Sequence, residues 1–141
     1  MKRIIFPWGV ILLIIFMAFV SYGEMEKIAI SESNLADLKG KWLGNRTVGT
    51  VAVKNTDLEI TNDSLPLKCK LTMYDVRFQG RAGTTVSLDF IGKINDQGNL
   101  LFGGSETEVE LSLYKKDDGE MKLEGKYFWK GVRGTMSFKK K

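Results

Sequence analysis

The chain lacks most of the residues on which enzymes build reactive centres. Its 141 residues include no histidine, one cysteine and two prolines. Without histidine the chain cannot form a Ser-His-Asp or Cys-His nucleophilic site, a histidine metal centre or an axial histidine ligand to haem. One cysteine supplies neither a zinc or iron–sulfur cluster nor an intramolecular disulfide. The hydrophobic core alone must therefore hold the fold together.

Carboxylates remain as a source of catalysis. A hydrolase with paired carboxylates would draw on Asp89, Glu108 and Glu110. These side chains fall on the polar faces of predicted strands or in turns, which favours a solvated surface. The turn at residues 95–99 lacks the spacing and the final glutamate of a calcium loop, and no glycine motif for phosphate or dinucleotide binding is present. We expect no enzymatic activity, no cofactor and no metal.

The charge of the chain gives no sign of a nucleic-acid partner. The formal net charge is +4, and it falls to +2 when Lys2 and Arg3 are set aside with the first segment. Acidic and basic residues are mixed along the remainder of the chain. A nucleic-acid-binding domain usually concentrates basic residues in a patch or stripe. We therefore expect no nucleic-acid binding.

The first 23 residues differ strongly from the rest. Lys2 and Arg3 precede an unbroken run of apolar or small residues at positions 4–20. As a helix this run would rise roughly 26 Å, slightly less than the roughly 30 Å hydrocarbon core of a bilayer. The small residues Ser21 and Gly23, followed by polar sequence, are typical of a signal-peptide cleavage site. We interpret residues 1–23 as a signal peptide cleaved after Gly23, with a retained single-span membrane anchor as the alternative.

This segment sets the expected compartment. A cleaved signal predicts a periplasmic or secreted domain, and an uncleaved one predicts a domain anchored by residues 1–23 to the outer side of the inner membrane. Cys69 lies too far along the chain to be the lipidated first residue of a lipoprotein.

The rest of the chain reads as one short helix followed by strands. Residues 33–38 predict one or two helical turns, with Ser33 as the N-cap and Gly40 as the stop. Beyond Gly40, short alternating runs are separated by Gly, Asn, Asp and Ser, which is typical of an antiparallel meander. In one such run Cys69 alternates with polar residues in step with Leu71 and Met73, which favours a buried thiol that acts as a small hydrophobic group.

Further alternation brings the predicted number of strands to about eight. The segments lie around residues 42–53 and 58–60 and at residues 65–73, 86–90, 109–113, 121–129 and 132–138. The turns at residues 95–99 and 116–120 each place Asp before Gly between two strands, as tight hairpins require. One domain with this strand spacing is a barrel or a sandwich.

Two short motifs resemble the lipocalin and avidin type of up-and-down barrel, the calycin superfamily. They are Leu38-Lys39-Gly40-Lys41-Trp42, before the first strand, and Gly131-Val132-Arg133-Gly134, in the last. In that superfamily a helical turn precedes Gly-x-Trp, and an arginine of the last strand packs across the tryptophan at the closed end. The resemblance implies that Gly40, Trp42 and Arg133 close one end. The chain lacks the superfamily's C-terminal helix and Thr-Asp-Tyr turn.

We therefore predict an all-β fold, a small antiparallel up-and-down barrel of about eight strands. A short N-terminal helical turn precedes the barrel, and a hydrophobic signal or anchor helix comes before that. The boundaries are residues 1–23 for the signal or anchor, 24–39 for a linker and the short helix, and 40–141 for the barrel.

Aromatic residues mark the candidate contact site. Alternation predicts that Tyr127 and Trp129 face the core with Leu123, and that Phe128 faces outward. If residues 108–115 pair with residues 121–129, we expect Phe128 to lie beside the outward Tyr114. Such a pair is either a cross-strand staple or a contact site for a partner or a sugar.

The function that these features favour is binding. We expect an exported binding protein whose barrel takes a small apolar ligand. The alternative is an envelope-associated interaction module, a subunit or inhibitor of another exported protein. The candidate contacts for ligand or partner are Tyr114, Tyr127, Phe128 and Trp129.

Overall fold

The computed structural model describes residues 25–49, 52–78 and 80–141. The predicted signal peptide or anchor, residues 1–23, lies outside the described residues. Across the described ranges, no helix has the length and apolar character needed to cross a bilayer.

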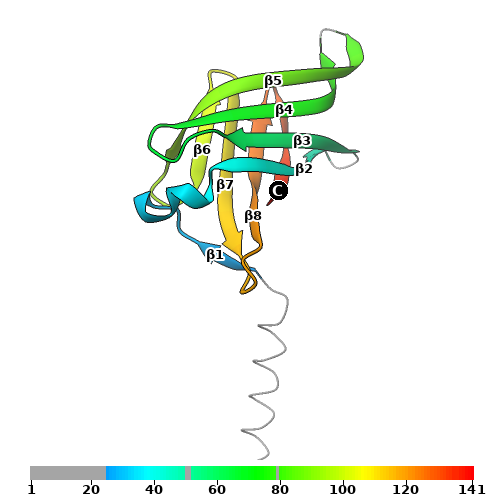
Figure 1. Ribbon diagram of the computed structural model, residues 1–141. Coiled ribbons are helices and arrows are strands. Elements are labelled where there is room, and N and C mark those ends of the chain that lie inside the picture. The colour runs from blue at the N-terminus through cyan, green and yellow to red at the C-terminus, as the bar shows by residue number, and fades with distance from the viewer. Residues whose placement is uncertain (1–24, 50–51, 79) are drawn as a thin grey trace, which may run out of the picture.

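Eight antiparallel strands form a closed barrel (Figure 1). Each strand pairs with the next along the chain, and the last pairs with the first through Trp42–Lys140 to Arg46–Met136. The sheet therefore closes on itself, and the predicted all-β up-and-down barrel is confirmed in its architecture. The strands are β2 (Gly40–Val48), β3 (Ala52–Ile60), β4 (Leu67–Phe78), β5 (Arg81–Ile94), β6 (Leu100–Gly104), β7 (Thr107–Lys115), β8 (Met121–Trp129) and β9 (Val132–Lys140).

One further strand, β1 (Glu26–Ile28), adds to the barrel wall. It pairs with Leu113 to Lys115 of β7, beyond the residues of β7 that pair with the short strand β6. Strand β1 thus continues the wall where β6 stops. The sequence prediction placed this segment in a linker, because three residues are too few to show a strand-like alternation.

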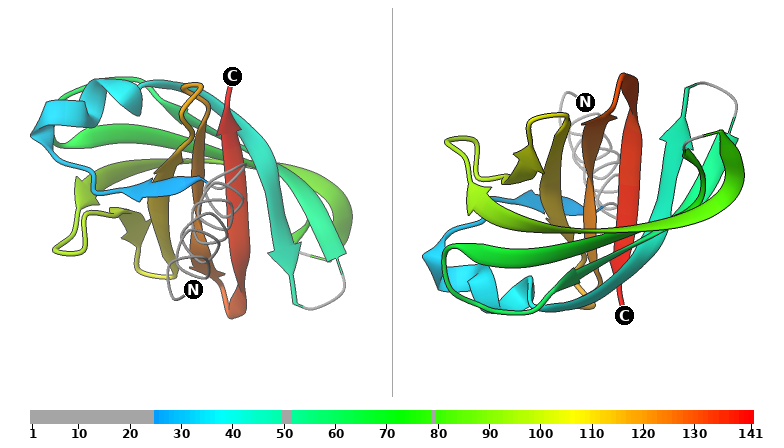
Figure 2. Two further views of the ribbon diagram at one scale, coloured as in Figure 1. Left: turned by 90° about the horizontal axis from the view of Figure 1, so that it is seen from below. Right: turned by 90° about the horizontal axis from the view of Figure 1, so that it is seen from above.

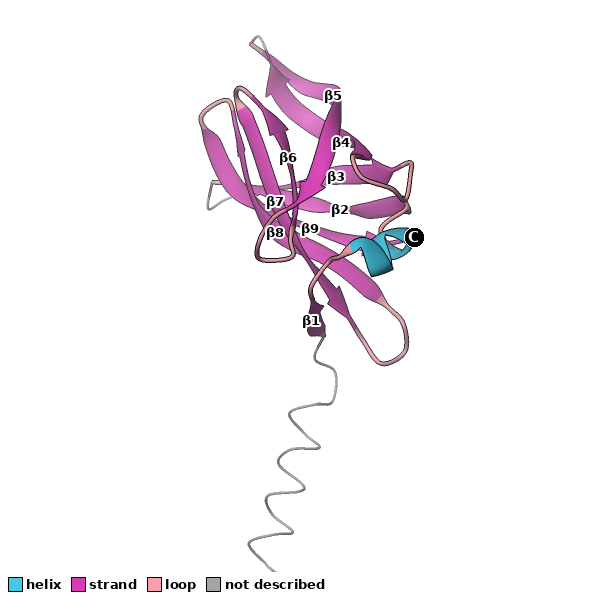
Figure 3. Ribbon diagram, turned by 90° about the vertical axis from the view of Figure 1, so that its left-hand side faces the viewer, coloured by secondary structure: helices cyan, strands magenta, loops and turns pink. Residues whose placement is uncertain are grey.

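Among the described residues one short helix, η1 (Glu32–Asp37), precedes the barrel and lies at one end of it (Figure 3). It is a 3₁₀ helix, and its N-cap is Ser31 rather than the predicted Ser33. The side-chain oxygen of Asn34 accepts a hydrogen bond from the Ser31 amide at 2.8 Å, while its amide group donates to the Ala29 carbonyl at 3.0 Å. Asn34 therefore fixes the entry of the chain into the helix. Gly40, with φ +134°, follows the helix and begins β2.

The hairpins form where the sequence predicts them. Residues 95–99 connect β5 to β6, and residues 116–120 connect β7 to β8. In the second hairpin Lys115 pairs with Met121 and Glu108 with Phe128, so the predicted pairing of residues 108–115 with residues 121–129 is confirmed. Gly98 and Gly119 supply the positive φ angles, 74° and 91°, that these turns require.

The hydrophobic core lies inside the barrel and includes a buried leucine of η1. Figure 2 shows η1 and the β2–β3 hairpin at opposite ends of the long strands. Within the described residues, β5 pairs with β6 only from Gly92 to Ile94. This limited pairing leaves Val86, Leu88 and Phe90 of β5 only partly buried, although they pack against the core as predicted. The largest side chains with almost no exposure include Trp42, Phe138, Leu38, Leu58, Ile60, Leu67, Leu71 and Met73.

Candidate binding site at the barrel mouth

One end of the barrel is closed by Trp42. Its side chain is 0% exposed, and its indole nitrogen donates a hydrogen bond to the Leu38 carbonyl at 2.8 Å. The ammonium of Lys140 lies 5.7 Å from the centre of the Trp42 ring and also donates to the carbonyl of Asp37. Lys140 therefore joins the last strand, the indole and the end of η1. Trp42 and these contacts therefore fill this end of the barrel.

Arg133 does not take part in this closure. The guanidinium lies 5.2 Å from the centre of the Phe128 ring, on the outer face of the neighbouring strand β8. The register of β2 and β9 places Lys140, not Arg133, opposite Trp42. The stacking of Arg133 on Trp42 that the resemblance implied is therefore wrong. Lys140 provides the cation at that position.

The opposite end of the barrel is hollowed. A cavity of about 280 Å³ lies there, between residues of six strands. We call this cavity the mouth. Its walls combine aliphatic and aromatic groups with three cations and one carboxylate. The lining residues are Arg46, Val48, Lys54, Met73, Asp75, Val76, Arg77, Ala82, Gly83, Tyr127, Trp129 and Val132.

Arg46 is the buried polar group of the mouth. Only 3% of the residue is exposed, because β2 directs it inward from the same face as Trp42. Its guanidinium donates to the Asn55 carbonyl at 2.8 Å, to the Thr56 hydroxyl at 2.9 Å and to the Tyr74 carbonyl at 2.8 Å. Burial lowers the pKa of Arg46 from its ordinary value, and the nearby Tyr127 and Asp75 oppose that shift. An arginine with so high an ordinary pKa stays charged.

A β-bulge in β4 prepares the acceptor for Arg46. The pairing of β4 with β5 shifts register between Met73 and Val76, so that β4 carries one extra residue there. Asp75 adopts a left-handed φ of 56° within the bulge, and Val76 turns inward in its place. Bulges change the direction of side chains and release backbone groups from the hydrogen bonds between the two strands. Here the bulge presents the Tyr74 carbonyl to Arg46 and sends Asp75 to the rim.

An ion pair stands at the rim of the mouth. The ammonium of Lys54 lies 2.5 Å from a carboxylate oxygen of Asp75. This contact lowers the pKa of Asp75, first through the hydrogen bond from Lys54 and then through its charge. Asp75 is thus committed to Lys54 and is not hydrogen-bonded to Arg46.

Two of the predicted aromatic residues line the mouth. Tyr127 is 5% exposed, and its hydroxyl donates to the Thr47 carbonyl at 2.7 Å. Burial raises the pKa of Tyr127, and the charge of Arg46 opposes the rise. Trp129 is half-buried against the core, and Leu123 is fully buried. The predicted inward parity of Leu123, Tyr127 and Trp129 is therefore confirmed.

The predicted outer aromatic pair does not form. Phe128 lies opposite Glu108, whereas Tyr114 lies opposite Lys122, six positions farther along the hairpin. Six positions of a strand span about 20 Å, so the two rings cannot touch. Parity placed both side chains outward, and the register separates them.

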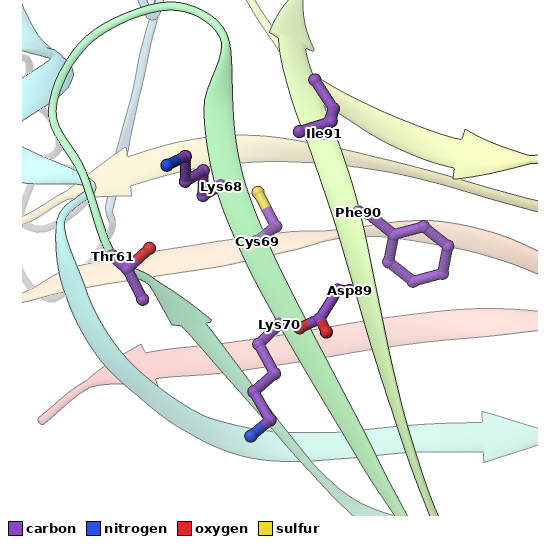
Figure 4. A pocket seen from close by; sticks show the side chains of 7 residues that line it. All are labelled: Thr61, Lys68, Cys69, Lys70, Asp89, Phe90 and Ile91. Atoms are coloured by element: carbon purple, nitrogen blue, oxygen red, sulfur yellow. The ribbon is translucent and has the colours of Figure 1, made fainter.

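A second hollow, of about 340 Å³, lies against β4 and β5 (Figure 4). Its polar side chains, such as Lys68, Lys70 and Asp89, are all exposed, so no buried charge or fixed polar group faces it. The Cys69 thiol at its edge is 3% exposed, and burial raises its pKa to about 12. The thiol is therefore protonated at neutral pH, and the predicted burial of this cysteine is confirmed.

The carboxylates considered for catalysis serve the fold or face solvent. Glu110 accepts hydrogen bonds from the side chains of Asn95 and Asn99 at 2.8 and 2.9 Å, which lower its pKa and pin the β5–β6 turn to β7. Asp89 and Glu108 are exposed. Among residues 25–49, 52–78 and 80–141, no three cysteine or acidic side chains converge as metal ligands do.

The sequence reasoning missed the polar residues of the mouth. Arg46, Lys54 and Asp75 were not among the predicted contacts. The signal for Arg46 was present, because it follows Trp42 by four residues and shares its parity on one strand. Asp75 could not be found in this way, because the bulge reverses the alternation at that point.

No protein-family model, no curated protein and no solved structure matches this chain.

Proposed function

We propose that this chain is an exported, non-enzymatic binding protein with a lipocalin-like barrel, and that the mouth holds a small apolar ligand. The observation that carries the proposal is the difference between the ends: one is filled by Trp42, and the other keeps a cavity of about 280 Å³. Ligand pockets usually measure about 300–1,000 Å³. The cavity lies just below this range, which indicates a small ligand.

The lining of the mouth supports an apolar ligand. Val48, Met73, Trp129 and Val132 present aliphatic and aromatic surface, and burying such surface stabilises a complex by about 25 cal/mol per Å². The alternative, a partner protein on the outer face near Phe128 and Tyr114, is less well supported because those two rings lie far apart. Export rests on the composition of residues 1–23.

A neutral fluorescent probe tests the proposal. The protein is purified in the form that the producing cells retain, and N-terminal sequencing establishes whether residues 1–23 are present. We expect N-phenyl-1-naphthylamine to bind saturably with one site per chain. Ala82→Trp, which places an indole at the rim, should weaken binding at least tenfold.

Ala36→Trp is the matched control, because Ala36 is exposed on η1 at the closed end. It should bind the probe as the unaltered protein does. Absence of saturable binding would contradict a site for an uncharged apolar ligand, and equal binding by the Ala82→Trp and Ala36→Trp variants would contradict a ligand site in the mouth.

A further inference from the structure

Arg46 carries a charge that no carboxylate of the described residues contacts directly, although the charge of Asp75 favours its charged form. Its three hydrogen bonds end on two carbonyls and one hydroxyl, all of them neutral. The salt bridges among the described residues join other cations, and Asp75 is held by Lys54. A buried charge is costly unless it is paired. A site for a counter-charge is therefore expected beside Arg46.

The guanidinium also keeps donors available. A guanidinium has five N–H groups. Both N–H groups of Nη1 and one of Nη2 account for the contacts to Asn55, Thr56 and Tyr74, which leaves Nε–H and one N–H of Nη2 without an acceptor among the described residues. Two donors are what a bidentate contact to a carboxylate or sulfonate uses.

The surroundings of Arg46 favour an anion that carries an apolar body. The mouth is lined by the cations Arg46, Lys54 and Arg77 against the single carboxylate of Asp75, so its charge is positive. The remaining wall is largely aliphatic and aromatic, with Val48, Met73, Val76, Trp129 and Val132. A ligand with only a charge would leave this surface uncovered, and one with only an apolar body would leave Arg46 without an anion in direct contact.

The geometry points to a small amphiphile with one acidic group as the ligand, its anion paired with Arg46 and its apolar body against Trp129 and Val132. This inference rests on the proposed function, because it names the ligand class of the same mouth. The cavity volume of about 280 Å³ restricts the body to about three rings at most, or to a short chain.

Two probes that differ in one group test the assignment. The compound 8-anilinonaphthalene-1-sulfonate has the ring system of N-phenyl-1-naphthylamine with an added sulfonate. We expect the unaltered protein to bind the sulfonate at least tenfold more tightly than the neutral probe, since a charge-assisted hydrogen bond to arginine is worth about a factor of ten or more. Octanoate, a carboxylate amphiphile, should displace the sulfonate probe.

Variants of Arg46 test whether this residue causes the tighter binding of the sulfonate. Arg46→Met should lower affinity for the sulfonate at least tenfold and leave affinity for the neutral probe within about threefold. Arg46→Lys retains the charge with fewer fixed donors and should give an intermediate value. Arg133→Met removes an arginine from the outer face and is the matched control, which should change neither affinity.

The outcomes separate the two proposals. Equal binding of both probes by the unaltered protein, or sulfonate affinity unchanged in Arg46→Lys and Arg46→Met, would overturn the role of Arg46 and leave the mouth as a site for neutral ligands. Binding of neither probe would overturn the proposed function, and the anion assignment with it. If Arg46→Met does not fold, the comparison of the two probes on the unaltered protein and on Arg46→Lys decides the question.

Discussion

The two ends of the barrel differ in what occupies the interior. Trp42 and Arg46 stand four residues apart on one strand and face the same interior. At the closed end an indole fills the space, and its single N–H donor is satisfied by Leu38. At the mouth a guanidinium lies along the wall and the space beyond it stays open. Trp42 fills the interior at one end, and Arg46 brings a charge beside the cavity at the other.

The difference extends to the residues that surround each end. Around Trp42 the contacts come from the short helix and from Lys140. They join the last strand, β9, to the helix that precedes the first strand of the barrel. Around Arg46 the contacts come from a bulged strand and from a rim ion pair. Bulges and left-handed residues such as Asp75 concentrate at functional sites, where strain is tolerated in exchange for placement of a group. The closed end is therefore expected to carry stability and the mouth to carry function.

The largest expected effect comes from emptying the closed end. Trp42→Ala should lower the free energy of unfolding by about 3 to 5 kcal/mol, because a fully buried aromatic ring leaves a cavity when it is removed. Leu43→Ala is the matched control, since Leu43 is the next residue on the same strand and is 45% exposed. Its cost should stay within about 0.5 kcal/mol. Urea denaturation measures both, and a Trp42→Ala loss as small as that of Leu43→Ala would show that the indole does not plug the barrel.

The next largest loss of stability should come from disturbing the pairing of β2 with β9, which closes the barrel. We call this pairing the seam. Gly44 lies on β2 between Trp42 and Arg46, and a Cβ at Gly44 would stand 1.8 Å from the Ser137 carbonyl oxygen of β9. Gly44→Ala should therefore push the closing strands apart and cost about 1 to 3 kcal/mol, the usual range for overpacking. Gly104→Ala is the control, because nothing lies within 4 Å of its Cβ position. Thermal unfolding compares them, and equal melting temperatures for the two variants would mean that the seam can relax.

Alternation along the strands predicted most of the architecture and two of the residues that line the mouth, Tyr127 and Trp129. It predicted the buried faces around Cys69, Leu123 and Tyr127 because each strand has one wet and one dry side. It failed where the outcome depends on how distant strands meet. The partner of Trp42 is set by the register of β2 against β9, and local sequence does not specify whether Arg133 or Lys140 arrives there. The bulge at Asp75 is also invisible to alternation, because one inserted residue changes the facing of all that follow.

The smallest expected effect concerns the rim of the mouth and appears only in acid. The hydrogen bond and charge of Lys54 hold the pKa of Asp75 below its ordinary value of 3.8. A carboxyl whose pKa is lower in the folded state stabilises the fold above its unfolded pKa, and that contribution is lost as the pH falls through the folded value. The difference in melting temperature between the unaltered protein and Asp75→Asn should thus be constant from about pH 7 to 5 and should close below about pH 4. Asp63→Asn, at an exposed loop position, controls for the loss of one negative charge. Because the Lys54–Asp75 pair is partly exposed, its contribution to stability is small. A difference in melting temperature that persists unchanged at low pH would show that Asp75 acts through its place in the bulge instead of through Lys54.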